Sequence, residues 1–286
     1  MFFRAFVLLA NFLIAAAAAM GHYHEADTIP REEQLQVDTL APDGQYGSGQ
    51  ADTLAPEPQY YRLNARYLKS FWPSFTYTVS RPAHWEKKDW VRFSVATASI
   101  GALMAADWEI RHIVQHNRGG IGEKVANTAE PFGNTYGVYI FPAMYVAGLI
   151  TRQPKFESAG LTGVKALAIS TVIYTASKKL IRRARPDATN SAFDYALPFA
   201  KQGYTSSPSG HSNTIFTVAT ALALEFRDTK WVPPLVYTIA GVTAISRIYH
   251  NRHWASDVVM GSLLGHFVTK AVWQSSQKKK VEYRTF

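Results

Sequence analysis

The chain has 286 residues, of which 47% are hydrophobic and 13% aromatic, and its formal net charge is +9. This length and apolar content suffice for a sizeable core and exclude a wholly disordered chain. The positive charge favours anionic partners such as phosphate esters, acidic lipid surfaces or nucleic acid. The sequence contains no cysteine, which excludes disulfides, thiolate nucleophiles and cysteine metal sites.

The N-terminus has the pattern of a secretory signal peptide. Arg4 precedes an apolar stretch over residues 5–19, and the small residues Ala17 and Ala19 suit a cleavage site. The stretch is shorter than the roughly 20 residues of a membrane span, so a retained anchor is the less favoured alternative. We expect a signal peptide over residues 1–20 and an exported protein, periplasmic or membrane-associated in a bacterial envelope.

A polar segment follows over residues 21–60. The sequence Asp-Thr-Leu-Ala-Pro occurs in it twice, at 38–42 and 52–56, with glycines between the copies. Few large apolar residues are present, which indicates a flexible linker ahead of one helical domain over residues 61–286. Aromatic residues then gather over 71–90, a pattern that suits either a packed shoulder or a membrane-interfacial belt.

Beyond residue 90, long apolar stretches alternate with polar turns. Lengths near or above fifteen residues favour helices over strands, so we predict an all-α fold, a six-helix bundle. Ser256 is expected to cap the last helix. The helices are expected over residues 91–108, 135–150, 161–181, 212–226, 234–248 and 257–273.

Hydropathy and charge argue against six membrane spans. The mean hydropathy is −0.11, which is low for such a protein. If all six helices crossed, the basic runs at 178–185 and 278–280 would lie on opposite sides, against the positive-inside rule. We therefore favour an exported bundle that is soluble or lies against a membrane, and we expect membrane contact.

The first candidate site cluster is basic and closes the third predicted helix. Lys178 and Arg185 are seven residues apart, about two helical turns, so both side chains can point the same way. Two cations at a helix end can bind a dianion. A solvated basic helix end that complements the helix dipole would give the same pattern.

The second cluster is a turn that leads into the fourth predicted helix, Pro208-Ser209-Gly210-His211. Backbone N–H groups at a helix start favour anions. Ser209 adds a hydroxyl donor, and Gly210 lets the backbone approach a phosphate closely. His211 is placed to act as a general acid near a leaving oxygen. The alternative is an ordinary capped helix start with an incidental histidine.

The third cluster combines Arg247, His253 and Asp257. His253 and Asp257 are four residues apart, the spacing at which a carboxylate reaches an imidazole across one helical turn. An aspartate on one ring nitrogen leaves the other free as nucleophile or base. A pair that only stabilises a helix start is the alternative. His250 has no carboxylate at that spacing, because position 254 is Trp254.

The three clusters, in this order, resemble the signature of the type 2 phosphatidic acid phosphatase superfamily. This superfamily includes lipid phosphatases, bacterial class A acid phosphatases and vanadium haloperoxidases. The resemblance covers roughly residues 90–274. Its motifs are Lys178 with Arg185-Pro186, Pro208-Ser209-Gly210-His211, and Ser246-Arg247 with His253 and Asp257.

The resemblance implies a role for each of these residues. His253 would attack phosphorus to form a phosphohistidine, Asp257 would orient it, and His211 would protonate the leaving oxygen. No metal or other cofactor is implied, because cations and helix-start dipoles would stabilise the transferred group. The phosphate oxygens would be bound by Lys178, Arg185, Ser209, Gly210 and Arg247.

The expected function is a phosphatase acting on phosphomonoesters or diphosphates. A lipid substrate is preferred, because the aromatic segment and the apolar helices suit an interface. The alternatives are a soluble periplasmic acid phosphatase that acts on a small phosphoester and a vanadium-dependent haloperoxidase. No nucleic-acid partner is expected, because an exported protein without an interleaved basic and aromatic stripe is a poor candidate.

Overall fold

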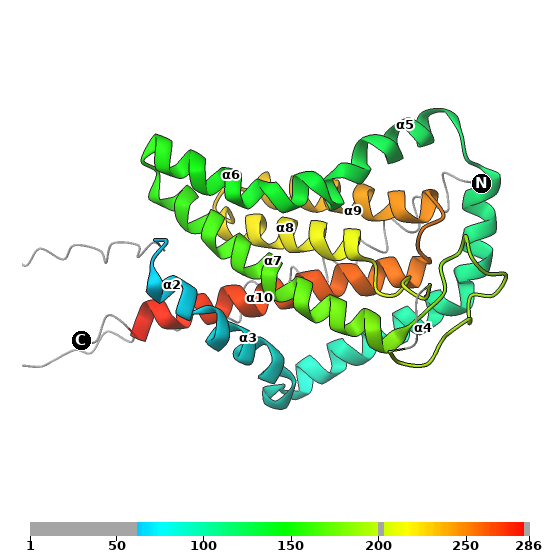
Figure 1. The fold of residues 1–286 in the computed structure, drawn as a ribbon, viewed down its shortest axis with the longest axis horizontal. Helices are drawn as coiled ribbons and strands as arrows, with labels where there is room; N and C mark the ends of the chain where they lie inside the picture. Colours follow the sequence, from blue (N-terminus) through cyan, green and yellow to red (C-terminus); the bar gives the residue numbers. More distant parts are fainter. Residues whose placement is uncertain (1–61, 200–202, 283–286) are drawn as a thin grey trace, which may run out of the picture.

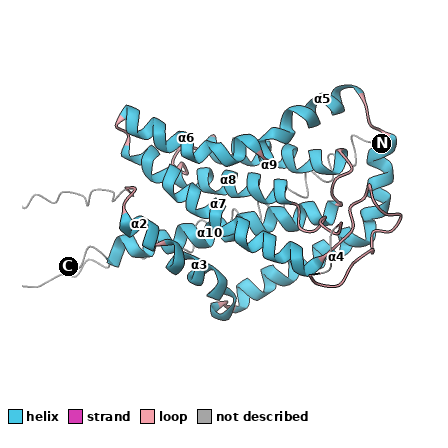
Figure 2. Ribbon diagram, viewed as in Figure 1, coloured by secondary structure: helices cyan, strands magenta, loops and turns pink. Residues whose placement is uncertain are grey.

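The computed structural model describes residues 62–199 and 203–282. The predicted signal peptide and linker lie outside the described residues. Within the described ranges the chain consists of helices and loops and has no strand, apart from one isolated bridge between Arg183 and Tyr195. Figure 2 shows this helical architecture, which confirms the predicted all-α fold.

Short helices precede the bundle. Helix α2 (Ala65–Lys69) and helix α3 (Phe71–Ser80) are followed by the 3-10 helix η2 (Arg81–His84) and the long helix α4 (Lys87–His116). A capping box fixes the start of α4, because the side chain of Glu86 and that of the third helical residue satisfy each other's backbone N–H groups. Helices α3 and α4 both pack against α10, the last helix of the chain (Figure 1).

The middle of the chain forms a helical hairpin. Helix α5 (Gly120–Ala129) leads through the 3-10 helix η3 (Glu130–Gly133) into α6 (Thr135–Thr151), which pairs with α7 (Pro154–Ile181). The turn is sharp because Arg152 adopts the left-handed conformation with φ 54°, and a proline then starts α7. Within the part of the chain that the structure describes, α7 alone is long and apolar enough to cross a membrane by length and composition.

Helix α8 (Gly210–Glu225) lies in the middle of the bundle, surrounded by α7, α9 (Val232–Tyr249) and α10 (Ala255–Glu282) (Figure 1). Its apolar side chains contribute to the main core cluster, whose fully enclosed members include Phe216 and Val258. The start of α8 touches α10 directly: a Cβ atom at Gly261 would lie 2.3 Å from the carbonyl oxygen of Ser209.

The six predicted helices are all present, as α4, α6, α7, α8, α9 and α10. The prediction that Ser256 caps the last helix is wrong, because α10 already begins at Ala255. Ser256 lies inside the first turn, where its N–H group and hydroxyl bond the carboxylate of Asp107 on α4 at 3.0 and 2.5 Å. Helix α5 and η3 were not predicted, since their residues form no long apolar run.

Candidate active site

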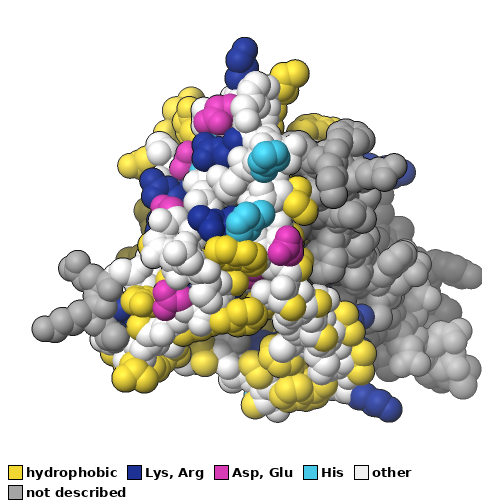
Figure 3. Space-filling model, turned by 90° about the vertical axis from the view of Figure 1, so that its right-hand side faces the viewer, with side chains coloured by type: hydrophobic (Ala, Val, Ile, Leu, Met, Phe, Trp, Pro, Cys, Tyr) yellow, Lys and Arg dark blue, Asp and Glu magenta, His cyan; other side chains and the backbone are white. Residues whose placement is uncertain are grey.

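The three candidate clusters meet at one end of the bundle. There α7 ends, α8 begins, α9 ends and α10 begins, so each cluster occupies a helix terminus or the adjoining loop. This end faces the viewer in Figure 3, where basic, acidic and histidine side chains gather above a largely hydrophobic surface. Charges far apart in the sequence therefore lie within electrostatic reach of one another.

His253 lies in the loop before α10 and is only 4% exposed. Its Nδ1 atom is 2.7 Å from the backbone carbonyl oxygen of Ser206. A carbonyl can only accept, so Nδ1 carries the proton and Nε2 keeps its lone pair. Burial lowers the pKa of His253 well below its ordinary value, and the positive charges of Lys178, Arg185 and Arg247 lower it further. The imidazole is therefore neutral at physiological pH, with the lone pair of Nε2 available for the nucleophilic role predicted for His253.

The expectation that Asp257 directly holds the imidazole of His253 is wrong. A contact across one helical turn requires both residues to be helical, but α10 begins at Ala255, beyond His253. The Asp257 carboxylate instead accepts from the Ser206 hydroxyl at 2.5 Å and from the Trp254 N–H group at 3.2 Å. Ser206 thus links the two residues, with its hydroxyl on Asp257 and its carbonyl on His253.

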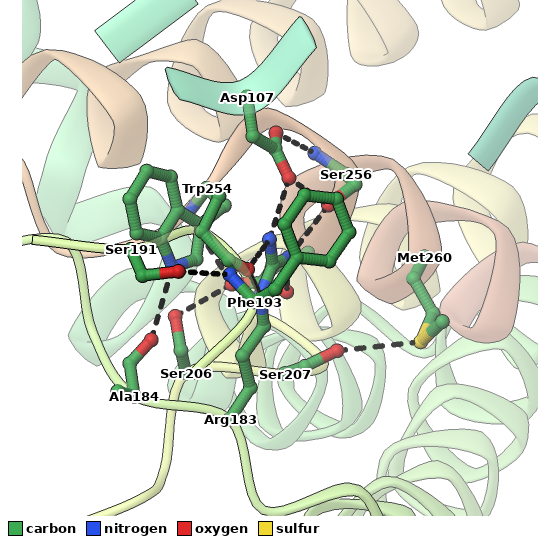
Figure 4. A network of polar contacts seen from close by, with 12 residues as sticks. Asp107, Arg183, Ala184, Ser191, Phe193, Ser206, Ser207, Trp254, Ser256 and Met260 are labelled. Atoms are coloured by element: carbon green, nitrogen blue, oxygen red, sulfur yellow. Dashed lines mark hydrogen bonds and ion pairs between the residues drawn. The ribbon is translucent and has the colours of Figure 1, made fainter. Parts of the chain in front are cut away.

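The buried guanidinium of Arg183 lies in a network of polar contacts that includes Asp257 (Figure 4). Arg183, 1% exposed, donates to Asp257 and to Asp107, each at 2.8 Å. It also donates to the Ser256 hydroxyl and to the carbonyl of Ala192. The network joins α4, the loop after α7 and α10. The bonds of Arg183 to Ser256, Asp257 and Asp107 span 73, 74 and 76 residues. No spacing rule could therefore have indicated Asp107 or this role for Arg183.

Two of the predicted phosphate-binding cations lie at the end of α7 and just beyond it. Lys178 donates to the carbonyl of Thr205 at 2.8 Å. Burial and the charge of Arg185 lower its pKa to about 8, against the opposing effect of Asp257, so it stays mostly protonated at neutral pH. Arg185 acts electrostatically on Lys178, His253 and Arg247, which places the predicted cations in one cluster.

The second cluster forms a capped helix start, as expected. The fully buried hydroxyl oxygen of Ser209 accepts from the N–H group of Ser212 at 3.4 Å and from its hydroxyl at 2.9 Å. Gly210 is the first residue of α8. The Ser209 N–H group donates to the backbone carbonyl of Asp257 at 3.0 Å. Ser209 therefore fixes the start of α8 against α10, and phosphate binding by Ser209 and Gly210 stays a prediction.

An acidic residue outside the three predicted clusters lies beside the remaining site residues. The Glu130 carboxylate on η3 forms an ion pair with Arg247, which is 5% exposed. It also lies 3.9 Å from Nε2 of His211 and 3.4 Å from Nδ1 of His250. His250 thus has a carboxylate neighbour after all, from a distant segment. Burial and the charge of Arg247 lower the pKa of His211 to about 4.

The site as described is built from cations, histidines and helix starts. Among the residues that the structure describes, no group of three or more histidine or acidic side chains is arranged to hold a metal ion. A tetrahedral anion could be bound by the side chains at the ends of α7 and α9, with its central atom open to attack by His253. This combination suits phosphoryl transfer to a histidine.

Residues 160–280 match the family model of the PAP2 superfamily. Over 103 residues, 36% of this chain, the sequence is 39% identical to a lipid A 1-phosphatase of Porphyromonas gingivalis. Over 144 residues, 48% of this chain, it is 27% identical to an undecaprenyl-diphosphatase of Sulfolobus acidocaldarius. The matches span 20% and 66% of the lengths of these two relatives.

The fold has a counterpart among solved structures, the transmembrane PAP2 type phosphatidylglycerolphosphate phosphatase of Bacillus subtilis. The TM-score is 0.52 at 22% sequence identity, and the similarity covers 66% of this chain and 94% of the other. At this identity the similarity concerns the fold alone. The match of residues 160–280 to the PAP2 family model supports the resemblance drawn from the three motifs, and the solved structure supports the predicted fold.

Proposed function

We propose that this chain is a phosphatase that hydrolyses phosphomonoesters or diphosphates of a lipid through a phosphohistidine on His253. The observation that carries the proposal is the state of this imidazole. Its Nδ1 atom is held by the Ser206 carbonyl at 2.7 Å, and the positive charges of Lys178, Arg185 and Arg247 act on it. A neutral buried nucleophile beside three cations fits an anionic electrophile such as a phosphoryl group.

In the first step, Nε2 of His253 attacks phosphorus, and the bond from phosphorus to the leaving oxygen breaks. The leaving oxygen takes the proton of His211, which becomes neutral. Lys178, Arg185 and Arg247 neutralise the charge on the phosphoryl oxygens, and the start of α8 adds N–H donors. The Ser206 carbonyl stabilises the Nδ1–H group as positive charge develops on the imidazole of His253.

In the second step, water attacks the phosphohistidine, and the bond between phosphorus and nitrogen breaks. Neutral His211 takes a proton from this water, which restores the acid for the next cycle. Phosphate leaves, and His253 returns to its neutral form with Nδ1 still on Ser206. Asp257 acts in both steps as a positioning residue, because it holds the Ser206 hydroxyl at 2.5 Å.

Two observations support a lipid substrate. The relatives named above carry the names of enzymes that act on lipid A or undecaprenyl diphosphate. The chain also exposes large aromatic side chains on its N-terminal helices, among them Trp72 at 70% and Trp90 at 50%. Exposed tryptophans of this kind suit a membrane interface. We propose an exported protein whose helical domain contacts the membrane in a bacterial envelope.

The nucleophile is tested by trapping the intermediate. The protein is mixed with 32P-labelled substrate and quenched in alkali, where phosphohistidine survives, and a parallel sample is treated with acid, which releases the label. His253→Ala should remove both turnover and labelling. His112→Ala is the matched control, because its Nδ1 also faces a backbone carbonyl, that of Trp108 at 2.9 Å, on the exposed side of α4. Full labelling of His253→Ala would place the nucleophile elsewhere.

The substrate class is tested with a panel of lipid phosphates, lipid diphosphates and small soluble phosphoesters. EDTA is present throughout, and both membrane and soluble fractions of the producing cells are assayed. We expect preferred turnover of a lipid substrate in the membrane fraction. Better turnover of small phosphoesters by the soluble fraction would support the soluble acid phosphatase instead. Halide oxidation that requires vanadate and peroxide would support the haloperoxidase.

A further inference from the structure

We propose that Glu130 is a positioning residue of this site, whose carboxylate favours the protonated form of His211 that donates to the leaving oxygen. The inference rests on the proposed function and adds a residue to it. Glu130 lies outside the three sequence motifs. Within the described structure it is the carboxylate that approaches His211, at 3.9 Å from Nε2.

The carboxylate of Glu130 is fixed from two sides. Arg247 on α9 donates to its Oε1 atom, and His250 faces its Oε2 atom at 3.4 Å. His250 is itself held by the side chain of Asn127 on α5 at 2.9 Å. Glu130 is therefore not a solvated surface acid, although 40% of its side chain is exposed. Burial raises its pKa, but the hydrogen bond and charge of Arg247, together with the charges of His250 and His211, lower it overall, so the carboxylate is ionised.

The backbone of η3 is held equally close to His211. A Cβ atom at Gly133 would lie 2.9 Å from the Cβ of His211 and 3.1 Å from a methyl group of Thr243. No larger residue fits there without moving η3, α8 or α9. The distance between Glu130 and His211 is therefore set by packing between elements, not by a flexible loop.

The other charges that face His211 are positive. They come from α9, from the end of α7 and from the loop after it: Arg247, Lys178 and Arg185. Each of these cations disfavours the imidazolium, as burial does, and Glu130 opposes them. The cations needed to bind phosphate would therefore leave the acid without its proton. A carboxylate beside His211 offsets this conflict within the site.

The role concerns one proton transfer. While His253 forms its bond to phosphorus, the bond between His211 Nε2 and its hydrogen breaks, and the electron pair of the broken phosphorus–oxygen bond accepts that proton. Glu130 neither accepts nor donates this proton, which passes from His211 to the leaving oxygen. It lowers the free energy of the state in which His211 is charged, so more of the bound enzyme carries the required proton.

The experiment compares Glu130→Gln with Glu123→Gln. Glutamine keeps one oxygen acceptor for Arg247 and removes the negative charge. Glu123 on α5 is the matched control, since 41% of its side chain is exposed, against 40% for Glu130. Its charge acts on His250 but is not among the charges that act on His211.

The first measurement is the pH dependence of kcat. The general acid must be protonated, so its loss appears as the alkaline limb of the profile. Removing the charge of Glu130 should move this limb to lower pH by about one unit, the lower end for a carboxylate at this distance. Above the limb, kcat should then fall by about tenfold. Glu130→Asp, which keeps the charge, should restore most of the shift, and Glu123→Gln should leave the profile unchanged.

The second measurement does not depend on turnover. The histidine ring signals of 15N-labelled protein are titrated by NMR, and His211 is assigned by its loss in His211→Asn. We expect the midpoint of His211 to fall in Glu130→Gln and to stay in Glu123→Gln. An unchanged midpoint together with an unchanged alkaline limb would overturn the inference even if the wild type is an active phosphatase. A wild type with no turnover and no phosphohistidine would overturn the proposed function, while the titration would still test Glu130.

Discussion

Arg183→Met should destabilise the protein far more than the loss of an ordinary arginine. The guanidinium is 1% exposed and pairs with Asp107 and Asp257, which are each 1% exposed as well. Methionine fills a similar volume but leaves two buried carboxylates without their cation. Removal of one partner from a buried pair costs about 3–5 kcal/mol, and here one residue serves two carboxylates. We expect the free energy of unfolding to fall by at least that amount, a large share of the roughly 5–15 kcal/mol typical of folded proteins.

The assay is urea unfolding followed by circular dichroism, with Arg252→Met as the matched control. Arg252 forms the same kind of pair, with Asp187 at 2.9 Å, but its side chain is 51% exposed. Such a surface pair is worth roughly 0–1 kcal/mol. A loss below about 1 kcal/mol for Arg183→Met would contradict this expectation, because the buried pairs would then contribute no more than a surface pair. If Arg183→Met does not accumulate, Asp107→Asn provides the test, because it breaks one ion pair and leaves Arg183 paired with Asp257. An Asp107→Asn variant as stable as the wild type would also contradict the expectation.

Further predictions concern the site. Asp257→Asn should lower kcat by about 10–100-fold, the range known for residues that orient metal-bound histidines. An unchanged kcat would exclude its action through Ser206. Gly261→Ala should destabilise the protein, because the new methyl group would lie 2.3 Å from a carbonyl oxygen. Gly241→Ala is the control and should not destabilise it, because open space surrounds Gly241. Thermal unfolding of the two variants provides the comparison. The general acid His211 has a pKa of about 4 in the free protein, so kcat/KM should fall as pH rises through that region. The alkaline limb of kcat should lie at higher pH, because bound phosphate raises the pKa of His211. Alkaline limbs of kcat and kcat/KM at the same pH would contradict the assignment of His211 as the acid.

Much of the fold was predictable because its determinants are local. The length of an apolar run favours a helix over a strand when it reaches about fifteen residues. All six such runs are helices. The segments without such a run, α5 and η3, were not predicted. The positions of α5 and η3 are fixed by contacts with α8 and α9. These contacts produce no regular apolar spacing in the sequence of α5 and η3.

In the site too, the residues within local motifs were predicted, and their contacts with distant residues were not. The two histidines and three cations were predicted from motifs in which every residue lies within a short stretch of chain. The partner of His253 was predicted wrongly, because a four-residue spacing brings two side chains together only within a helix, and His253 precedes the first helical residue, Ala255. The Nδ1 atom of His253 faces the Ser206 carbonyl instead, and Asp257 accepts from the Ser206 hydroxyl.

The helical class, the order of the helices and the chemistry of the residues at their ends follow from local patterns in the sequence. The contacts that those residues make follow from the packing of the helices. Asp107 and Arg183 lie 76 positions apart, and Glu130 and Arg247 lie 117 positions apart. Burial in a shared interior decides which charges must pair. That choice depends on how whole helices pack, and it leaves no spacing in the chain from which it could be inferred.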